Sequence, residues 1–203
     1  MASSADILKC LLLNTHCEER YKKVDWKDLF LESIHELWLK PIETWVQDLN
    51  LSNNKLASVP RNISNMKSLI QLNLSGNNLN VITREVFSLP SLRYLNISKN
   101  NLQKLPRFPA KGKISLKSLN VSDNKLKALP QSIMLTSLEI LNLSKNSFTE
   151  VPLCVCEITT LKDLDVSHNR EINSLPQAMG KLRNLCYLGL KDLDKVKYLC
   201  IFL

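Results

Sequence analysis

The chain is poor in the residues that dominate fibrous and disordered proteins, with four glycines and eight prolines among its 203 residues. Collagen-like and low-complexity sequences need far more of both, so this shortage argues against those classes. No apolar run approaches the roughly 20 residues that a membrane-spanning helix requires. With 44% hydrophobic residues, the sequence instead predicts a globular chain that buries a continuous core and has no integral membrane segment.

The amino-terminal segment lacks the features of a secretory signal. It carries Asp6 and no basic leader, and Lys9 interrupts its apolar stretch. The six cysteines form no paired clusters beside the rest of the pattern, as a disulfide framework of a secreted protein would need. They are Cys10, Cys17, Cys154, Cys156, Cys186 and Cys200. We therefore expect a cytoplasmic protein.

Metal-binding residues are sparse. Cys154 and Cys156 are separated by a single residue, and only His168 lies near them in the sequence. A zinc site needs four ligands or three ligands and an open position, so buried thiols are the better interpretation of this pair. The sequence predicts no metal and no cofactor.

Catalytic constellations are also lacking. His16, His35 and His168 are far apart, and none has a nucleophile and an orienting acid at a recognisable spacing. Asp163 and Asp165 lie two residues apart, which is more often a solvated rim than a catalytic pair. We expect the chain not to be an enzyme.

The chain does contain a repeated phrase, Leu-x-x-Leu-x-Leu-Ser-x-Asn, which first runs from Val46 to Asn54. Its central leucine recurs every 22 to 24 residues, at Leu49, Leu72, Leu95, Leu119, Leu141, Leu164 and, in a degenerate form, Leu188. This period and spacing are typical of the leucine-rich repeat, a strand-plus-arc unit. We predict an α/β solenoid of horseshoe shape, with a parallel concave sheet, convex arcs of short helix or 3₁₀ helix, and an amino-terminal helical cap.

Two further columns of residues mark where each strand ends and where each arc begins. An amide can satisfy backbone groups that a turn leaves unpaired, which explains the column Asn54, Asn77, Asn100, Asn124, Asn146 and Asn169. Proline cannot donate to a strand ladder, so the pairs at 59–60, 105–106, 129–130, 151–152 and 175–176 begin the arcs. After Leu105 and Pro106 the sequence predicts an extended loop in place of a helix.

The pattern divides the chain into four segments. Residues 1–20 are expected to form a helix, residues 21–45 a degenerate capping repeat, and residues 46–193 the regular repeats. The tail, residues 194–203, is apolar where a solenoid needs a polar cap. We therefore expect a further domain or a partner to cover that end.

Within the capping repeat, the segment from Leu29 to Leu37 resembles a degenerate first repeat. The three tryptophans of the chain, Trp26, Trp38 and Trp45, are expected to cover the open end of the core.

The consensus of residues 46–193, extended as Leu-x-x-Leu-x-Leu-Ser-x-Asn-x-Leu-x-x-Leu-Pro, resembles that of the intracellular Ras-associated group of leucine-rich-repeat proteins. The segment from Asp6 to Asn14 resembles a helix of an ankyrin repeat. Together with the segment from Met179 to Leu190, it resembles the leucine-rich-repeat kinases of the Roco family. In that family such repeats precede a Ras-like GTPase domain and a kinase domain. The chain contains neither a phosphate-binding loop nor an Asp-Phe-Gly motif, so the resemblance implies a recognition segment without the catalytic parts.

The outward strand positions differ between repeats and are therefore free to encode a partner. Aromatic and arginine side chains often dominate interface energies, which makes Tyr94, Arg93 and Ile140 the best anchors. The predicted partner-binding residues of the concave face are Arg93, Tyr94, Asn96, Lys117, Asn120, Glu139, Ile140, Asn142, Asp163, Asp165 and His168.

The formal net charge is +8, and the basic residues are dispersed among acidic ones except in the loop over residues 104–117, where they are concentrated. Its basic residues are Lys104, Arg107, Lys111, Lys113 and Lys117. An acidic protein or an anionic lipid headgroup suits this loop better than nucleic acid, since Phe108 is its only aromatic residue for base stacking.

Three functions remain open at this point. The sequence favours a non-catalytic protein–protein interaction module or scaffold in intracellular signalling, bound to a protein partner such as a small GTPase or a signalling kinase. The first alternative is the recognition fragment of a larger Roco-type GTPase and kinase. The second is a binder of anionic lipid or nucleic acid through residues 104–117.

Overall fold

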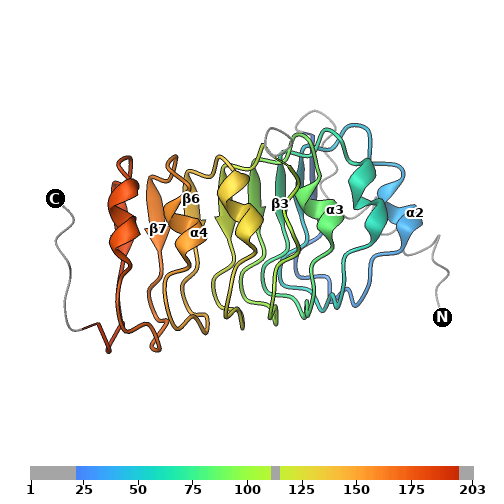
Figure 1. Cartoon of the computed structure of the whole chain (residues 1–203). Helices are drawn as coiled ribbons and strands as arrows, with labels where there is room; N and C mark the ends of the chain where they lie inside the picture. The colour runs from blue at the N-terminus through green and yellow to red at the C-terminus, as the bar shows by residue number, and fades with distance from the viewer. Residues whose placement is uncertain (1–21, 111–114, 197–203) are drawn as a thin grey trace.

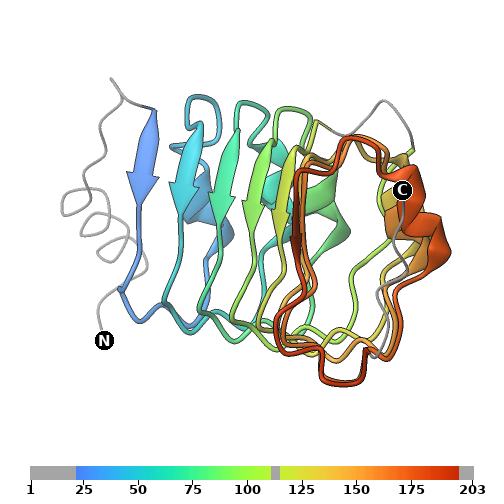
Figure 2. The ribbon, with the colours of Figure 1, turned by 90° about the vertical axis from the view of Figure 1, so that its left-hand side faces the viewer.

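The computed structural model describes residues 22–110 and 115–196. These residues form one parallel sheet of eight strands in chain order, with each strand hydrogen-bonded to the next. The strands are β1 (Lys23–Asp25), β2 (Asp48–Asn50), β3 (Gln71–Asn73), β4 (Tyr94–Asn96), β5 (Ser118–Asn120), β6 (Ile140–Asn142), β7 (Asp163–Asp165) and β8 (Tyr187–Gly189). Figures 1 and 2 show the strands stacked side by side, with the helical segments on the opposite side of a continuous core. The predicted solenoid is confirmed.

The period of the repeat sets the register of the sheet. Leu49 pairs with Leu72, and the pairing continues through every predicted central leucine to Leu188. In each strand from β2 to β7 the central leucine is buried, while the residue on either side is exposed or half-buried. This alternation is what a strand with a single buried face requires.

Short helices form the convex side of the solenoid. They are α2 (Glu36–Leu39), η2 (Arg61–Asn65), α3 (Arg84–Phe87), η3 (Gln131–Leu135), α4 (Leu153–Cys156) and η4 (Gln177–Lys181), of which the η segments are 3₁₀ helices. Proline immediately precedes four of them, at Pro60, Pro130, Pro152 and Pro176. Proline suits this place because its fixed φ begins the turn away from the sheet and no hydrogen-bond donor is needed there.

The arc of α3 and the arc after it differ from this arrangement of a proline followed by a helix. Before α3, Thr83 caps the helix by accepting a hydrogen bond from the Glu85 amide at 3.2 Å. In the described part of the following arc, residues 101–110 and 115–117, no helix forms, which agrees with the predicted loop. Phe108 of that arc is buried, and its ring packs edge-on against Phe87 with the ring centroids 4.6 Å apart.

The amino-terminal end differs from the sequence expectation. The first strand is β1, which pairs Val24 with Leu49, and not the segment from Leu29 to Leu37. Leu29 and Leu37 are exposed, whereas Val24 and Trp26 are fully buried. The physical reason is periodicity: Val24 and Trp26 alternate with polar residues in the same way as the leucine pairs of the later repeats.

The tryptophans of this end divide into two kinds. Trp26 and Trp38 are buried in the core, as expected for residues that cover its open end. Trp45 is half-buried, and its Nε1 atom donates a hydrogen bond to the Pro41 carbonyl at 3.0 Å. The helix expected over residues 1–20 and the tail from residue 197 lie outside the described residues. Among the described helices, none is both long and apolar enough to cross a membrane.

The predicted asparagine column forms a ladder inside the solenoid. Asn77 is 5% exposed, and its Nδ2 atom donates to the carbonyls of Leu51 and Leu74, both at 3.0 Å. Its Oδ1 atom accepts the amide proton of Leu56 at 3.0 Å. One side chain therefore joins two consecutive repeats and satisfies backbone groups that have no strand partner.

We predict that Asn77→Ala lowers the free energy of unfolding by about 1–3 kcal/mol, because it leaves buried backbone groups without partners. Asn78→Ala is the matched control, since Asn78 is exposed and its side chain makes no hydrogen bond within residues 22–110 and 115–196. Urea unfolding followed by circular dichroism measures both. Equal midpoints for the two variants would contradict a structural role for the ladder.

Candidate partner-binding face

The register of the sheet sorts the outward side chains of the concave face into rows. The edge row precedes the strands and comprises Gln47, Ile70, Arg93, Lys117, Glu139, Lys162 and Cys186. The strand row opens the strands and comprises Asp48, Gln71, Tyr94, Ser118, Ile140, Asp163 and Tyr187. The amide row closes strands β2 to β6 and comprises Asn50, Asn73, Asn96, Asn120 and Asn142. Neighbouring members of a row lie about 4.8 Å apart, the spacing of paired strands.

Ion pairs link three members of the edge row. Glu139 contacts Lys117 at 2.9 Å and Lys162 at 2.8 Å, each through a different carboxylate oxygen. Hydrogen bonds from Lys162 and then Lys117 lower the pKa of Glu139 to about 2, and the same pairing raises the pKa of Lys162. Two lysines and one glutamate leave this triad with one net positive charge.

The triad also changes the expected roles of its members. Lys117, predicted for both the face and the basic loop, lies on the face and is engaged by Glu139. Lys162, absent from the predicted contacts, completes the triad. The signal for it was in the sequence, because Lys117, Glu139 and Lys162 occupy the same repeat position with alternating charge.

A hollow of about 290 Å³ opens in the middle of the concave face. It spans β3 to β5, and Ser118 at its edge lies between Tyr94 and Ile140 in the strand row. These two neighbours are 48% and 42% exposed, so large apolar side chains stand on both sides of the serine. The hollow itself is lined by Gln71, Leu72, Asn73, Tyr94, Leu95, Asn96, Ser118 and Asn120. The structure thus brings together Tyr94, Asn96 and Asn120 from the predicted set.

The amides of the amide row share one orientation, which their own turns impose. Each Oδ1 atom accepts the backbone proton of the serine two residues later, at 3.1 Å for Asn96, 3.0 Å for Asn120 and 2.9 Å for Asn142. The Nδ2 atoms of this row have no acceptor within the part of the chain that the structure describes. The row therefore presents hydrogen-bond donors, and not acceptors, to anything bound on the face.

The remaining predicted face residues lie at the carboxy-terminal end, away from the hollow. Asp163 and Asp165 belong to β7, two strands beyond Ser118. Asp165 holds the same turn as the amide row, accepting the Ser167 amide proton at 2.9 Å. His168 follows this strand in a left-handed conformation, with φ at 60°. Its Nδ1 atom lies 2.8 Å from the Asp192 carboxylate, a partner that the sequence prediction missed.

The basic loop is only partly described. Lys104 and Arg107 are exposed, while Lys111 and Lys113 lie outside the described residues. Phe108 is 5% exposed and packs on Phe87, so it offers no free ring face for stacking on a base.

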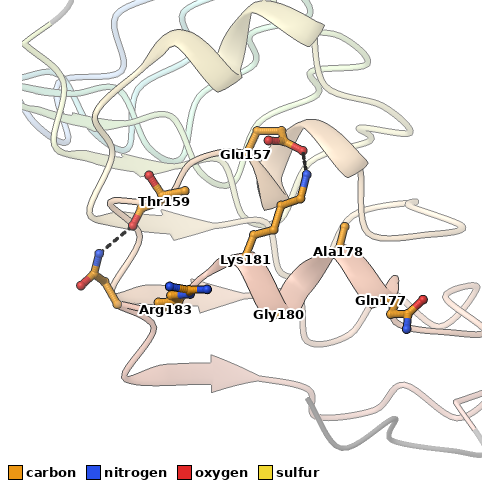
Figure 3. A pocket seen from close by; sticks show the side chains of 8 residues that line it. Glu157, Thr159, Gln177, Ala178, Gly180, Lys181 and Arg183 are labelled. Atoms are coloured by element: carbon orange, nitrogen blue, oxygen red, sulfur yellow. Dashed lines mark hydrogen bonds and ion pairs between the residues drawn. The ribbon is translucent and has the colours of Figure 1, made fainter. Parts of the chain in front are cut away.

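A larger hollow, of about 780 Å³, lies on the convex side between α4 and η4 (Figure 3). Lys181 contacts Glu157 across it, and Asn184 donates a hydrogen bond to the Thr159 carbonyl at 2.8 Å. These groups already satisfy one another, and no exposed large apolar side chain lines the hollow. The concave hollow is therefore the better candidate for a partner site, although it is smaller.

The cysteines of α4 are buried, as the sequence predicted. Burial raises the pKa of Cys156 to about 11 and also raises that of Cys154, so both remain protonated thiols at neutral pH. Within the described ranges, no group of three or more potential metal ligands occurs.

Comparisons with known proteins agree with the repeat fold. A family model described as "Leucine rich repeat" matches residues 45–102 and 114–170, more than half of the chain. A segment of 58 residues is 38% identical to the mouse leucine-rich repeat serine/threonine-protein kinase 1, and covers 29% of this chain but 3% of that protein. The leucine-rich repeat domain of the type III effector XopL superposes with a TM-score of 0.76 at 18% identity. That match covers 96% of this chain and 74% of the XopL domain, and at this identity it shows the fold alone.

We predict that the Glu139 carboxyl titrates near pH 2, and that Lys162→Met moves its pKa up towards the ordinary value of 4.5 because the strongest hydrogen bond is lost. Carboxyl chemical shifts followed by NMR between pH 1.5 and pH 7 give both values. Lys181→Met, which removes a lysine from the convex side, is the control.

The sign of the linked stability follows from the lowered pKa. The pairs stabilise the fold fully above about pH 4.5, and this stabilisation is lost as the pH falls from 4.5 towards 2. Added salt weakens the effect, since the groups are partly exposed. A Glu139 pKa near 4.5 in the unmodified protein would show that the triad does not persist in solution.

Proposed function

This chain belongs to the leucine-rich repeat family, and from that premise we propose that it is a non-catalytic scaffold that holds a protein partner against its concave face. Domains of this family typically act as protein-interaction modules. The observation that carries the proposal for this chain is the exposed Tyr94, which lines the hollow, with the exposed apolar Ile140 two strands further along the same row. An apolar anchor next to a cleft is the usual centre of a protein interface.

Rigidity supports the same proposal. The outward residues of β2 to β7 stand on, or directly before, strands of three residues whose central leucine is buried, so their backbone is fixed before a partner arrives. Binding then costs little conformational entropy beyond the ordering of a few side chains. Such a surface is suited to recognition.

The proposed setting is intracellular signalling in the cytoplasm, with a small GTPase or a signalling kinase as partner. Support comes from the 58-residue similarity to the mouse leucine-rich repeat serine/threonine-protein kinase 1. The alternative proposal is that the repeats serve as the recognition part of a larger protein of the Roco type, and its support is the same similarity, which covers 3% of that relative's length. Nucleic acid is a weaker proposal, since the one aromatic ring of the basic loop is buried.

We predict that Tyr94→Ala and Ile140→Ala each reduce the recovery of bound partners from cell extract at least tenfold, because each removes an anchor from the centre of the face. Both side chains are about half exposed, so the unfolding midpoint should hardly change. Quantitative mass spectrometry of proteins retained by the immobilised chain measures the recovery.

The matched control is Leu153→Ala, which removes a side chain that is 63% exposed on the convex helix α4. Its recovery profile should equal that of the unmodified chain. Loss of partners with Leu153→Ala, and none with Tyr94→Ala or Ile140→Ala, would place the interface on the convex side.

A further inference from the structure

We infer that the partner presents an extended acidic segment to the concave face, with one aliphatic side chain in the hollow at Ser118 and flanking carboxylates on Asn96, Asn120 and Arg93. This inference rests on the proposed function and specifies the chemistry of the partner. Three independent observations support it: the donor character of the amide row, the distribution of charge and the size of the hollow.

The amide row presents hydrogen-bond donors to a ligand. The Oδ1 atoms of Asn73, Asn96, Asn120 and Asn142 are held by their own turns, at 2.9–3.1 Å from a serine amide. What remains available is a line of Nδ2 donors spaced by about 4.8 Å. A bound group must therefore bring acceptors, and an ionised carboxylate is acceptor-only with two oxygens. Hydrogen bonds to a charged acceptor are also stronger than those to a neutral one.

Charge favours the same ligand. From β3 to β6 the strand row and the amide row contain no carboxylate; their members are Gln71, Tyr94, Ser118, Ile140, Asn73, Asn96, Asn120 and Asn142. Arg93 on one side of this strip and Lys99 and Lys145 on the other are exposed, and none has an ion-pair partner within residues 22–110 and 115–196. Asp123 lies between the two lysines, and Lys117 and Glu139 lie beside Arg93 as an ion pair, so four cations and two anions flank the strip.

The strip is also bounded by negative charge. Asp48 precedes it on β2, and Asp163 and Asp165 follow it on β7. An acidic segment therefore meets attraction over four strands, about 14 Å from the first strand to the last, and repulsion beyond them. This length suits a short extended peptide segment. A longer polyanion, such as a nucleic acid strand crossing the whole face, would meet the aspartates at both ends.

The size of the hollow indicates which side chain of the partner lies between its acidic residues. The hollow's volume of about 290 Å³ falls just below the roughly 300–1,000 Å³ of typical small-molecule sites, so it suits one side chain better than a cofactor. Among the residues that line it, Leu72, Tyr94 and Leu95 supply apolar surface, and Tyr94 is the exposed one. An aliphatic residue can pack in the hollow, and acidic residues on either side of it can accept hydrogen bonds from the Nδ2 atoms of the amide row.

The test uses fluorescein-labelled peptides and anisotropy titrations at 0.15 M salt. The first probe has the sequence Gly-Glu-Glu-Leu-Glu-Glu-Gly, and three relatives replace its glutamates by glutamine, its glutamates by lysine, or its leucine by glycine. We expect the first probe to bind at least tenfold more tightly than each relative. Equal binding of the lysine peptide would overturn the inference.

Asn120→Asp is the decisive variant, because it changes a donor into an acceptor without removing the turn. Asp25 and Asp165 already hold equivalent turns, accepting amide protons at 3.3 Å and 2.9 Å. We expect at least a tenfold loss of affinity for the first probe. Asn50→Asp makes the same change on β2, outside the strip and about 10 Å from Asn96, slightly more than the Debye length of about 8 Å at this salt concentration. It should weaken binding by less than threefold, whereas equal losses for both variants would overturn the inference.

The hollow is tested by Ser118→Trp, which fills it, and by Ser118→Ala, which leaves it open. The tryptophan variant should lose at least tenfold in affinity and the alanine variant less than twofold, with unfolding midpoints confirming that both fold. Unchanged binding by the tryptophan variant would contradict the proposed position of the aliphatic side chain. A single-stranded oligouridine that binds more tightly than the first probe and displaces it would overturn the inference in favour of a phosphate ligand.

The inference and the proposed function fail in different ways. If no acidic peptide binds while Tyr94→Ala still abolishes partner recovery, the face is an interface for a partner of other chemistry, and only the inference is wrong. If partner recovery is insensitive to Tyr94→Ala and Ile140→Ala, the concave interface itself is wrong.

Discussion

The hydrogen bonds of the interior asparagines are the constraint on which the rest of the structure depends. Asn100 shows the arrangement: its Nδ2 atom donates to Leu74 of the preceding repeat and to Ile97 of its own, at 3.0 Å and 3.1 Å. Its Oδ1 atom accepts the amide proton of Leu79 at 3.0 Å. A strand can end after three residues because these bonds satisfy the backbone amides and carbonyls that have no partner in the neighbouring strands. Every repeat therefore turns at the same place, and the register cannot slip.

Because the register is fixed, residues at the same position of consecutive repeats become neighbours on the concave face. Because Lys117, Glu139 and Lys162 fall in one row, they form ion pairs across three repeats that are distant in sequence. Because Gln71, Tyr94 and Ser118 fall in one row, residues of three consecutive strands line one hollow. Neither feature requires a change of backbone. Recognition in this chain thus resides in side chains, and stability resides in the leucines and interior asparagines behind them.

The repeat period predicted the register, the central leucines and the rows of the face, since each depends on spacing alone. The first strand was harder to predict: the segment from Leu29 to Leu37 is richer in leucine, yet the shorter alternation of Val24 and Trp26 forms the strand. The orientation of the Asn120 amide and the pairing of His168 with Asp192 could not be predicted, because they depend on how side chains meet in space. Spacing places a residue on a face but does not specify which of its atoms remains free.

Asparagine has two different roles in this chain, and the difference bears on function. In the interior ladder both ends of the amide are required, since Asn124 donates to the Ile97 and Val121 carbonyls and accepts from the Leu102 amide. In the amide row the fold needs only the oxygen, which is why Asp165 can hold the same turn. Gly189 occupies the next position of that row without any side chain. An amide in the outer row is therefore not required by the backbone, and its free Nδ2 donor is available to a partner. The unbroken run of amides from β2 to β6 keeps carboxylates out of the centre of the face, where a carboxylate would repel an acidic ligand.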